Sequence, residues 1–213
     1  MTSRYLNWKT YATRLNSVEA ALARRRRATR ARFLEQTIPS GGVGAELGVY
    51  KGYFTRTLLD VLAPETIHLI DPWYVLGARW EWAFGDRSTV EALVGILRTY
   101  APELTSGRAV LHIGDDTEVL RTFPDRYFDW VYLDTTHDYS HSCKELELLA
   151  VKVKTDGVIA GDDWQSDPTH VHHGVCRAVR EFIECEPYEL IYADDVNKQW
   201  AIRRLCESPT GPG

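Results

Sequence analysis

The chain has 213 residues, with 25 Lys or Arg against 30 Asp or Glu, which gives a formal net charge of −5. This length suits one domain with a sizeable core, and the acidic balance disfavours nucleic acid as a partner. No apolar run approaches the roughly 18 residues of a membrane-spanning helix, and residues 1–10 lack the apolar stretch of a secretory signal.

Residues 4–38 predict helix in two pieces, because neither Gly nor Pro interrupts them. Six arginines lie between positions 24 and 32. They could form a solvated helix face, an oligomer contact in a homodimer, or a rim that attracts an anionic substrate. We therefore expect a helical extension over 1–38 that acts as a lid or oligomer contact, a main domain over 39–206, and a disordered tail over 207–213.

Strand and helix patterns alternate from residue 43, which is typical of a parallel sheet. Strands are expected at 43–48, 66–71, 109–113, 127–133 and 157–161, with helices at 52–62, 87–101, 116–122, 141–154 and 172–185. Two further strands, 188–192 and 199–203, flank a short polar turn and must pair antiparallel as a hairpin. The pattern thus predicts an α/β fold in which an antiparallel hairpin completes a five-strand alternating sheet.

Carboxylates follow two of the expected strands at the point where each strand ends. Asp134 comes directly after one apolar run, and Asp162 and Asp163 come after the next strand. A strand, a crossover helix and a parallel strand bring these acids to the sheet edge at which α/β proteins bind ligands. Oxygen-only ligands favour Mg²⁺, Ca²⁺ or Mn²⁺.

The first strand ends in a glycine-containing turn with the spacing E-x-G-x-x-x-G, made by Glu46, Gly48 and Gly52. Glycines at such a turn let a ligand approach the backbone closely. The spacing differs from the G-x-G-x-x-G of nicotinamide enzymes, which disfavours a dehydrogenase.

The second and third strands also end in acidic residues. Asp71 could accept two hydrogen bonds from ribose hydroxyls. After Gly114, a carboxylate of Asp115 or Asp116 could take the amino group of an adenine or could cap the following helix. Both roles can coexist, one on each residue.

In this order and spacing, the motifs resemble those of class I S-adenosylmethionine-dependent methyltransferases, and more narrowly the metal-dependent O-methyltransferases of sugar hydroxyls, the macrolide-sugar enzymes among them. The resemblance covers residues 43 to about 203 and omits the N-terminal helices. It implies a Rossmann-like seven-stranded sheet, mostly parallel with an antiparallel last strand and helices on both faces. It also implies which residues bind S-adenosylmethionine and Mg²⁺: Gly48 and Gly52 around the methionine part, Asp71 on ribose, Asp115 near adenine, with Glu46, Gly114 and Asp116 beside them, and Asp134, Asp162 and Asp163 on the metal.

A general base should assist a hydroxyl acceptor by about 10²–10⁴-fold. His137, three residues beyond Asp134, is the candidate, although it could serve only to orient its loop. His173 could also reach a substrate from the cluster that it forms with His170 and His172. A zinc site in that cluster is disfavoured, because no cysteine lies at a suitable spacing.

Five aromatic residues lie between positions 73 and 84, beyond the expected ribose acid. They could form a lid or ring-binding wall, or they could pack beneath the N-terminal helices.

The expected activity is methyl transfer from S-adenosylmethionine to a hydroxyl of a sugar or oligosaccharide, with Mg²⁺ (or Mn²⁺) activating the hydroxyl. The alternatives are a catechol-like phenol as acceptor, a hydroxylase-type reaction, or a module that binds S-adenosylmethionine without catalysis. The four cysteines show no C-x-x-C spacing, so we expect free thiols and a cytoplasmic protein.

Overall fold

The computed structural model describes residues 17–75 and 86–205. Its strands are β1 (Val43–Leu47), β2 (Thr66–Asp71), β3 (Ala109–Ile113), β4 (Phe128–Leu133), β5 (Val153–Gly161), β6 (Tyr188–Asp194) and β7 (Gln199–Arg204). Its helices are α2 (Ser17–Thr37), α3 (Thr55–Leu62), α4 (Asp86–Thr99), α5 (Ala101–Thr105), α6 (Asp116–Arg121), α7 (Tyr139–Lys152) and α8 (His173–Cys185).

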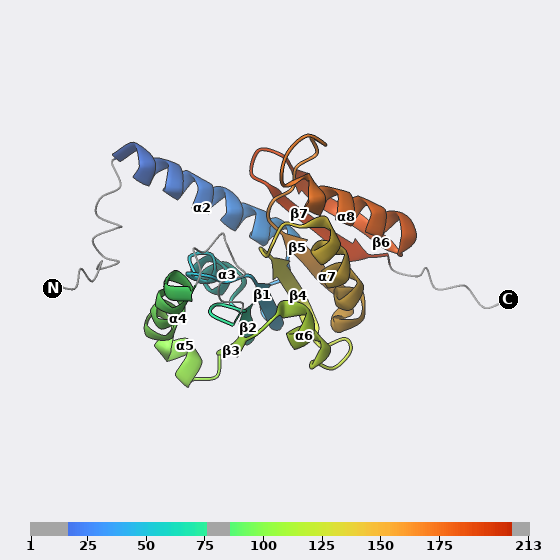
Figure 1. The fold of residues 1–213 in the computed structure, drawn as a ribbon. Helices are drawn as coiled ribbons and strands as arrows, with labels where there is room; N and C mark the ends of the chain where they lie inside the picture. The colour runs from blue at the N-terminus through green and yellow to red at the C-terminus, as the bar shows by residue number, and fades with distance from the viewer. Residues whose placement is uncertain (1–16, 76–85, 206–213) are drawn as a thin grey trace.

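The seven strands form one sheet in the order β3-β2-β1-β4-β5-β7-β6 (Figure 1). The pairs from β3 to β5 are parallel, and β7 runs antiparallel to both β5 and β6. This confirms the predicted fold class. The chain order reverses between β1 and β4, and ligands of such sheets bind beyond the strand ends at this switch point.

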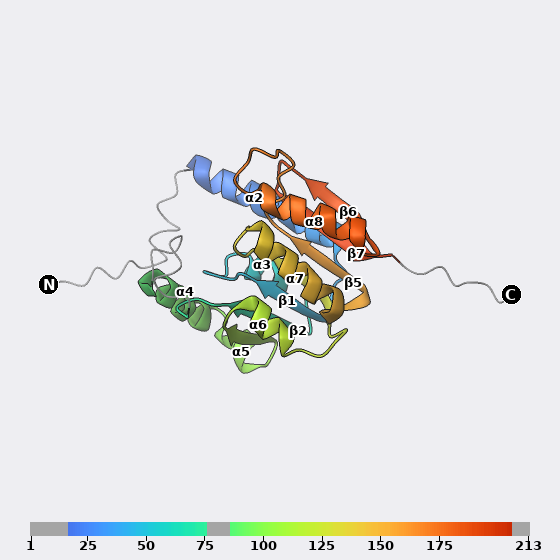
Figure 2. The ribbon, with the colours of Figure 1, turned by 45° about the vertical axis from the view of Figure 1, so that its right-hand side comes forward.

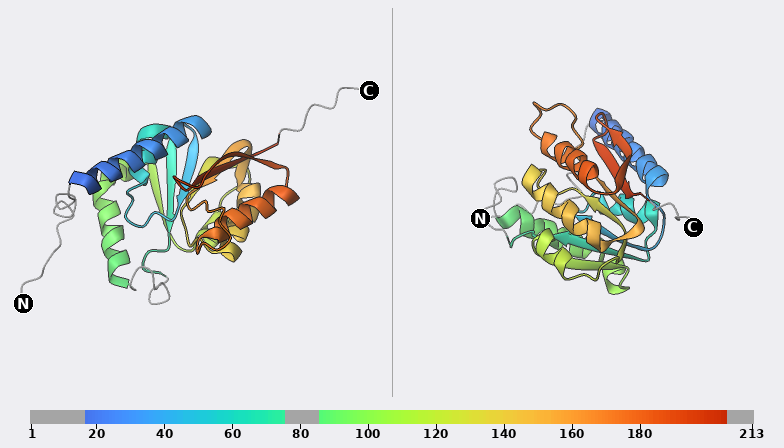
Figure 3. Two further views of the ribbon diagram at one scale, coloured as in Figure 1. Left: turned by 90° about the horizontal axis from the view of Figure 1, so that it is seen from above. Right: turned by 90° about the vertical axis from the view of Figure 1, so that its right-hand side faces the viewer.

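Helices cover both faces of the sheet and enclose two apolar cores (Figure 3). One core joins α2, α3 and α4 to the sheet, and the other joins α6, α7 and α8 to it. Successive side chains of a strand point to opposite faces, so Trp130 and Tyr132 of β4 lie in the first core while Val131 and Leu133 lie in the second. Figure 2 shows α7 and α8 side by side on the second face.

Several predicted boundaries are wrong by a few residues, for identifiable reasons. The helix expected over 87–101 is two helices, with Pro102 in the first turn of α5, because Pro offers no N–H to continue a helix. The helix expected over 141–154 begins at Tyr139, since the Asp138 carboxylate accepts a hydrogen bond from the His141 N–H at 3.1 Å. It ends at Lys152, and the next two residues already belong to β5.

The predicted N-terminal extension is described from residue 17, where α2 begins. Its C-terminal half packs on the domain through Phe33 and Leu34, which are fully buried beside α3. A dimer contact through residues 4–38 stays a prediction, and the expected tail lies outside the described residues. Within 17–75 and 86–205, no helix combines the length and the apolar character needed to cross a bilayer.

Candidate active site

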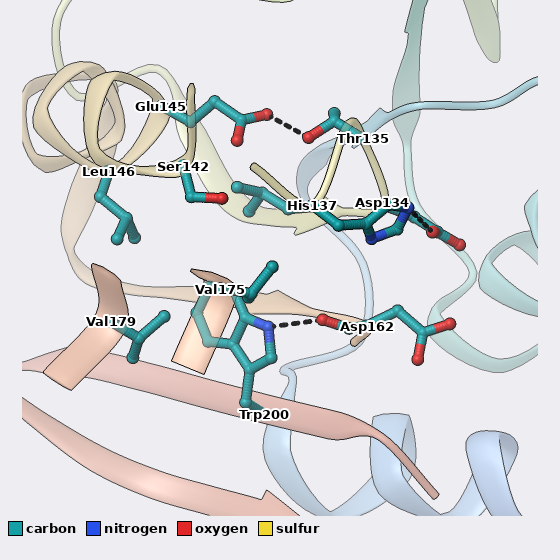
Figure 4. Close-up of a pocket in the computed structure, with 11 residues that line it drawn as sticks. Asp134, Thr135, His137, Ser142, Glu145, Leu146, Asp162, Val175, Val179 and Trp200 are labelled. Atoms are coloured by element: carbon teal, nitrogen blue, oxygen red, sulfur yellow. Dashed lines mark hydrogen bonds and ion pairs between the residues drawn. The ribbon is translucent and has the colours of Figure 1, made fainter. Parts of the chain in front are cut away.

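Three carboxylates converge at the carboxyl end of the sheet. Leu133 of β4 pairs in register with Gly161 of β5, so Asp134 and Asp162 follow the two strands side by side. One oxygen each from Asp134, Asp162 and Asp163 lie within 4.8 Å of one another. Figure 4 shows Asp134 and Asp162 at this edge, with His137 beside them. The structure thus brings together the residues that the sequence singled out as metal ligands, and we call these three residues the acid cluster.

Asp162 is held by side chains from the hairpin strand β7. It is only 6% exposed, and its Oδ1 accepts a hydrogen bond from Gln199 Nε2 at 2.6 Å. Trp200 Nε1 donates to the Asp162 backbone carbonyl at 2.9 Å. The Gln199 amide oxygen in turn accepts from the Tyr132 hydroxyl at 2.7 Å. The antiparallel end of the sheet therefore fixes one oxygen of the central carboxylate.

Arg30 of α2 forms an ion pair with the other oxygen, Asp162 Oδ2. Its side chain is 12% exposed, and the guanidinium carbon lies 5.0 Å from the centroid of the Phe54 ring. Arg26 lies one turn earlier, with its NH2 group 3.8 Å from the same oxygen. The arginine-rich segment thus supplies cations to the acid cluster, a role that the sequence did not reveal.

Asp163 is paired with His137, and both residues have positive φ angles, of 58° and 59°. Burial lowers the pKa of His137, but the hydrogen bond to Asp163 and the negative charges of Asp163 and Asp134 together raise it above the ordinary value. Burial raises the pKa of Asp163, but the hydrogen bond from His137 and the nearby charges of His137, His172 and Arg30 together bring it below its ordinary value. At Asp134, 4.0 Å from His137 Nε2, burial raises the carboxyl pKa.

The histidines at 170–173 contribute differently from the sequence prediction. His172 lies against His137, with ring centroids 5.1 Å apart, and both histidines offer nitrogens to a group that includes Asp163. His173, which the sequence suggested could also reach a substrate, instead has Nδ1 bonded to the backbone carbonyl of Gln165 at 2.8 Å. The conformation of the loop determines whether His172 or His173 faces His137, and the sequence spacing alone could not show this.

A buried polar group lies behind the acid cluster on α7. Thr135 Oγ1 donates to Glu145 Oε1 at 2.8 Å, and His141 Nε2 lies 3.0 Å from Asp116 Oδ2. Burial raises the pKa of Glu145 well above its ordinary value. A cavity of about 10 Å³ separates this group from Asp162 (Figure 4) and is lined by Asp134, Thr135, His137, Ser142, Glu145, Asp162 and Trp200, among others. That volume holds about one water molecule.

The predicted cofactor turn brings β1 against the acid cluster. Gly48 has φ +82°, and a Cβ there would lie 1.9 Å from the carbonyl oxygen of Asp134, so only glycine permits this approach. Gly52 has φ +68° and begins the turn into α3. Glu46 is buried, where burial raises its pKa well above the ordinary value, and it accepts a hydrogen bond from Thr55 Oγ1 at 2.5 Å.

Asp71 is fully buried and holds the loops after β1 and β2 together. Its Oδ2 accepts from the backbone N–H groups of Val49 and Tyr50 at 2.9 and 2.8 Å, and its Oδ1 accepts from that of Trp73 at 2.6 Å. Burial raises the pKa of Asp71 despite these bonds. Both oxygens therefore already serve the backbone, and contact with a ribose stays a prediction.

Asp115 caps α6, which is one of the two roles that the sequence suggested for it. Its Oδ1 accepts from the N–H of Thr117 at 3.0 Å and from Thr117 Oγ1 at 2.6 Å. Asp116 is turned towards His141, and Gly114 precedes both at the end of β3. An adenine contact by Asp115 or Asp116 stays a prediction.

The aromatic segment after β2 is described only in part. Trp73 is buried, and its indole N–H donates to the Tyr50 carbonyl at 2.9 Å, whereas Tyr74 is about half exposed. Trp73 therefore packs as core. The remaining aromatics of the predicted lid, Trp80, Trp82 and Phe84, lie outside the described residues.

Comparisons with known proteins agree with this geometry. Residues 45–164 match the family model described as a methyltransferase domain. A Methanococcus maripaludis protein classed as an S-adenosyl-L-methionine-dependent methyltransferase superposes with a TM-score of 0.61 at 14% identity, over 99% of each chain. A SAM-dependent methyltransferase from Aquifex aeolicus gives 0.55 at 14% identity, over 80% of this chain and 86% of that one.

A Streptococcus mutans protein classed as a methyltransferase and solved in complex with SAH gives a TM-score of 0.55 at 12% identity, over 84% and 97% of the two chains. At these identities the similarity shows a shared fold. No sequence among the curated proteins matches the chain.

Proposed function

The chain belongs to the methyltransferase-domain family and is a class I S-adenosylmethionine-dependent methyltransferase, and we propose that it methylates a hydroxyl of a sugar or oligosaccharide with the help of Mg²⁺. The observation that carries this proposal is the convergence of three carboxylates beside the cofactor turn. The acceptor class rests on the resemblance of the motifs to those of sugar O-methyltransferases.

The acid cluster fits a hard divalent cation by its donor chemistry. Asp134, Asp162 and Asp163 offer only oxygen, within 4.8 Å of one another, and Mg²⁺ takes a few carboxylate oxygens while keeping positions for water or substrate. A bound cation would acidify a coordinated hydroxyl and orient its lone pair. The three aspartates would hold the ion, provided that the present partner of Asp162 Oδ2 gives way.

The protein's own residues would position the reactants. The Gly48 turn abuts the Asp134 carbonyl, so the loop expected to hold the donor lies against the loop expected to hold the acceptor. Such proximity is worth several kcal/mol of a displacement barrier, about 7–11 kcal/mol in favourable cases. His137, beside Asp134 and Asp163, is the proposed base for the hydroxyl proton. Its pairing with Asp163 would orient the ring, and His172 packs against it.

The cofactor would occupy the loops after β1, β2 and β3. Ile113, at the end of β3, is 40% exposed next to Gly114 and Asp115, and an exposed apolar side chain beside carboxylates suits a purine ring with its amino group. The SAH bound to the structurally similar Streptococcus mutans protein supports a nucleoside ligand on this fold. We also keep a cytoplasmic location, which accords with the free thiols of Cys143, Cys176 and Cys185.

The test is a methyl-transfer assay with labelled S-adenosylmethionine and acceptor panels of sugars, oligosaccharides and catechols. Each acceptor is tried with Mg²⁺ and with EDTA. We expect labelled sugar with Mg²⁺ and none with EDTA. Label on catechols alone would favour the phenol alternative, turnover that resists EDTA would refute the metal, and S-adenosylmethionine binding without transfer to any acceptor would favour a non-catalytic module.

A further inference from the structure

The acid cluster already contains a cation that the protein itself provides. Arg30 forms an ion pair with Asp162 Oδ2, and both side chains are largely buried, at 12% and 6% exposure. Its sequence neighbours behave differently: Arg27 pairs with Asp60 at 3.0 Å on the surface, and Arg26 is 68% exposed. Arg30 is thus the buried arginine at the proposed metal site, whereas Arg26 reaches the same oxygen, at 3.8 Å, from the surface.

We propose that Arg30 competes with the divalent cation for Asp162, so that the ion binds only when the guanidinium leaves and helix α2 sets the affinity of the site. This inference rests on the proposed metal dependence. It adds a positioning role for a helix outside the region matched by the methyltransferase-domain model, residues 45–164.

The two oxygens of Asp162 show why the exchange would occur at one atom. Oδ1 is held at 2.6 Å by the neutral amide of Gln199, which is itself fixed by Tyr132. Oδ2 has Arg30 as its buried ion-pair partner, with the exposed Arg26 at 3.8 Å. A cation that also binds Asp134 and Asp163 needs an oxygen facing them, and Oδ2 is the Asp162 oxygen not already bonded to β7.

The charge balance favours exchange over simultaneous occupancy. Asp134, Asp162 and Asp163 carry three negative charges when ionised, and Arg30 and Arg26, which both approach Asp162 Oδ2, carry two positive ones. Glu46 adds little, because burial raises its pKa well above the ordinary value. A divalent ion in addition to both cations would reverse the net charge from −1 to +1, whereas an ion in place of Arg30 brings it to zero.

Arg30 is also placed to leave. Within the described residues its Nε has no hydrogen-bond partner, and the guanidinium rests on the face of Phe54, a contact that tolerates sliding. Removing a cation from a buried carboxylate is unfavourable unless another charge replaces it. The metal would be that replacement.

The first experiment measures Mn²⁺ binding by electron paramagnetic resonance of the free ion in four proteins. Arg30→Gln keeps a polar side chain without the charge and should bind Mn²⁺ about tenfold or more tightly than wild type, a difference of about 1.4 kcal/mol. Arg30→Lys keeps a competing charge and should stay close to wild type. Arg27→Gln, on the same helix with a surface partner, is the matched control and should leave the affinity unchanged.

A second measurement does not depend on Arg30→Gln, in case that variant does not fold. Arginine Nε–H signals of the wild type are followed by ¹⁵N nuclear magnetic resonance during Mg²⁺ titration, with the Arg30 signal assigned from its absence in Arg30→Lys. We expect this signal to shift in step with Mg²⁺ binding while that of Arg27 stays in place.

The outcomes separate the competition from the proposed function. If the wild type and Arg30→Gln bind Mn²⁺ equally, or if the Arg30 signal is unmoved at Mg²⁺ saturation, the competition is wrong while metal dependence survives. If neither protein binds Mn²⁺, the competition is overturned, and sensitivity of the methyl-transfer assay to EDTA then decides the metal proposal separately.

Discussion

The two halves of the sheet edge use carboxylates in opposite ways. On the cofactor side, Asp71 and Asp115 accept hydrogen bonds mainly from backbone N–H groups of their own or adjoining loops. On the acid-cluster side, Asp162 and Asp163 face charged side chains, and that of Arg30 comes from helix α2, far earlier in the chain.

This difference distinguishes carboxylates that hold a loop in shape from carboxylates that can be released to a ligand. A backbone N–H is fixed by the fold, so a carboxylate that it satisfies mainly shapes a loop. An arginine or histidine side chain can move or change its charge, so a carboxylate that it satisfies can be released to a ligand. We therefore expect changes on the cofactor side to reduce stability and changes in the acid cluster to reduce turnover.

The largest expected effect is that of Asp163→Asn on catalysis. Loss of one anionic ligand, and of the partner that orients His137, should reduce turnover on the order of 10²-fold or more. Affinity for S-adenosylmethionine, measured by calorimetry, should stay near that of the wild type. Asp125→Asn, which alters an exposed carboxylate paired with Lys152, is the control. A variant that turns over normally, or that loses the cofactor instead, would show that the two sides are not divided as described.

Asp71→Ala should act chiefly on stability. It leaves three backbone donors without their acceptor, and buried donors of this kind cost about 1–3 kcal/mol each when water cannot reach them. We expect the free energy of unfolding in urea to fall by about 2–4 kcal/mol and cofactor affinity to fall with it. Weaker cofactor binding at unchanged stability would instead assign Asp71 to the ribose alone, and an unchanged dissociation constant would remove it from the cofactor site.

The sequence predicted strands and strand ends well because apolar runs and turn residues are local signals. It placed Asp134 beside Asp162 because parallel strands share an edge. It could not pair Arg30 with Asp162, since a run of arginines on a helix does not show which one faces the sheet. Nor could it choose between His172 and His173, or show that backbone groups already occupy Asp71, because these depend on loop conformation.

A third prediction compares how the cofactor side and the acid cluster respond to a fall in pH. His68 of β2 is buried in a chain of neutral groups, with Nδ1 2.9 Å from His112 Nε2 and Nε2 3.2 Å from the Tyr127 hydroxyl. Burial, with a smaller contribution from His112, lowers the pKa of His68 to about 4. A lowered histidine pKa gives stability that is complete above about pH 6.5 and is lost as the pH falls towards 4.

The contribution of His68 to the free energy of unfolding should therefore be about 1–2 kcal/mol smaller at pH 5 than at pH 7, and hydrogen exchange should speed up first in β2 and β3. His137 has a raised pKa, so its pairing is fully formed below about pH 6.5 and should protect the acid cluster over the same range. His68→Asn should flatten the pH dependence of unfolding. If hydrogen exchange speeds up in the loops after β4 and β5 before it does in β2 and β3, the predicted difference between the two sides is wrong.

The smallest effect expected is that of substitutions at Asp115. They test whether this residue only caps α6 or also contacts the cofactor. Asp115→Ala removes the acceptor of the first N–H groups of α6 and should cost about 1 kcal/mol of unfolding free energy, whereas Asp115→Asn can still cap and should cost little. Glu118→Gln, on the exposed first turn of the same helix, is the control for charge. If Asp115 also contacts adenine, Asp115→Asn will weaken cofactor binding without loss of stability. If Asp115 only caps the helix, cofactor affinity will fall only in the variant whose unfolding free energy falls. Asp115, like Asp71, would then serve to hold its loop in shape.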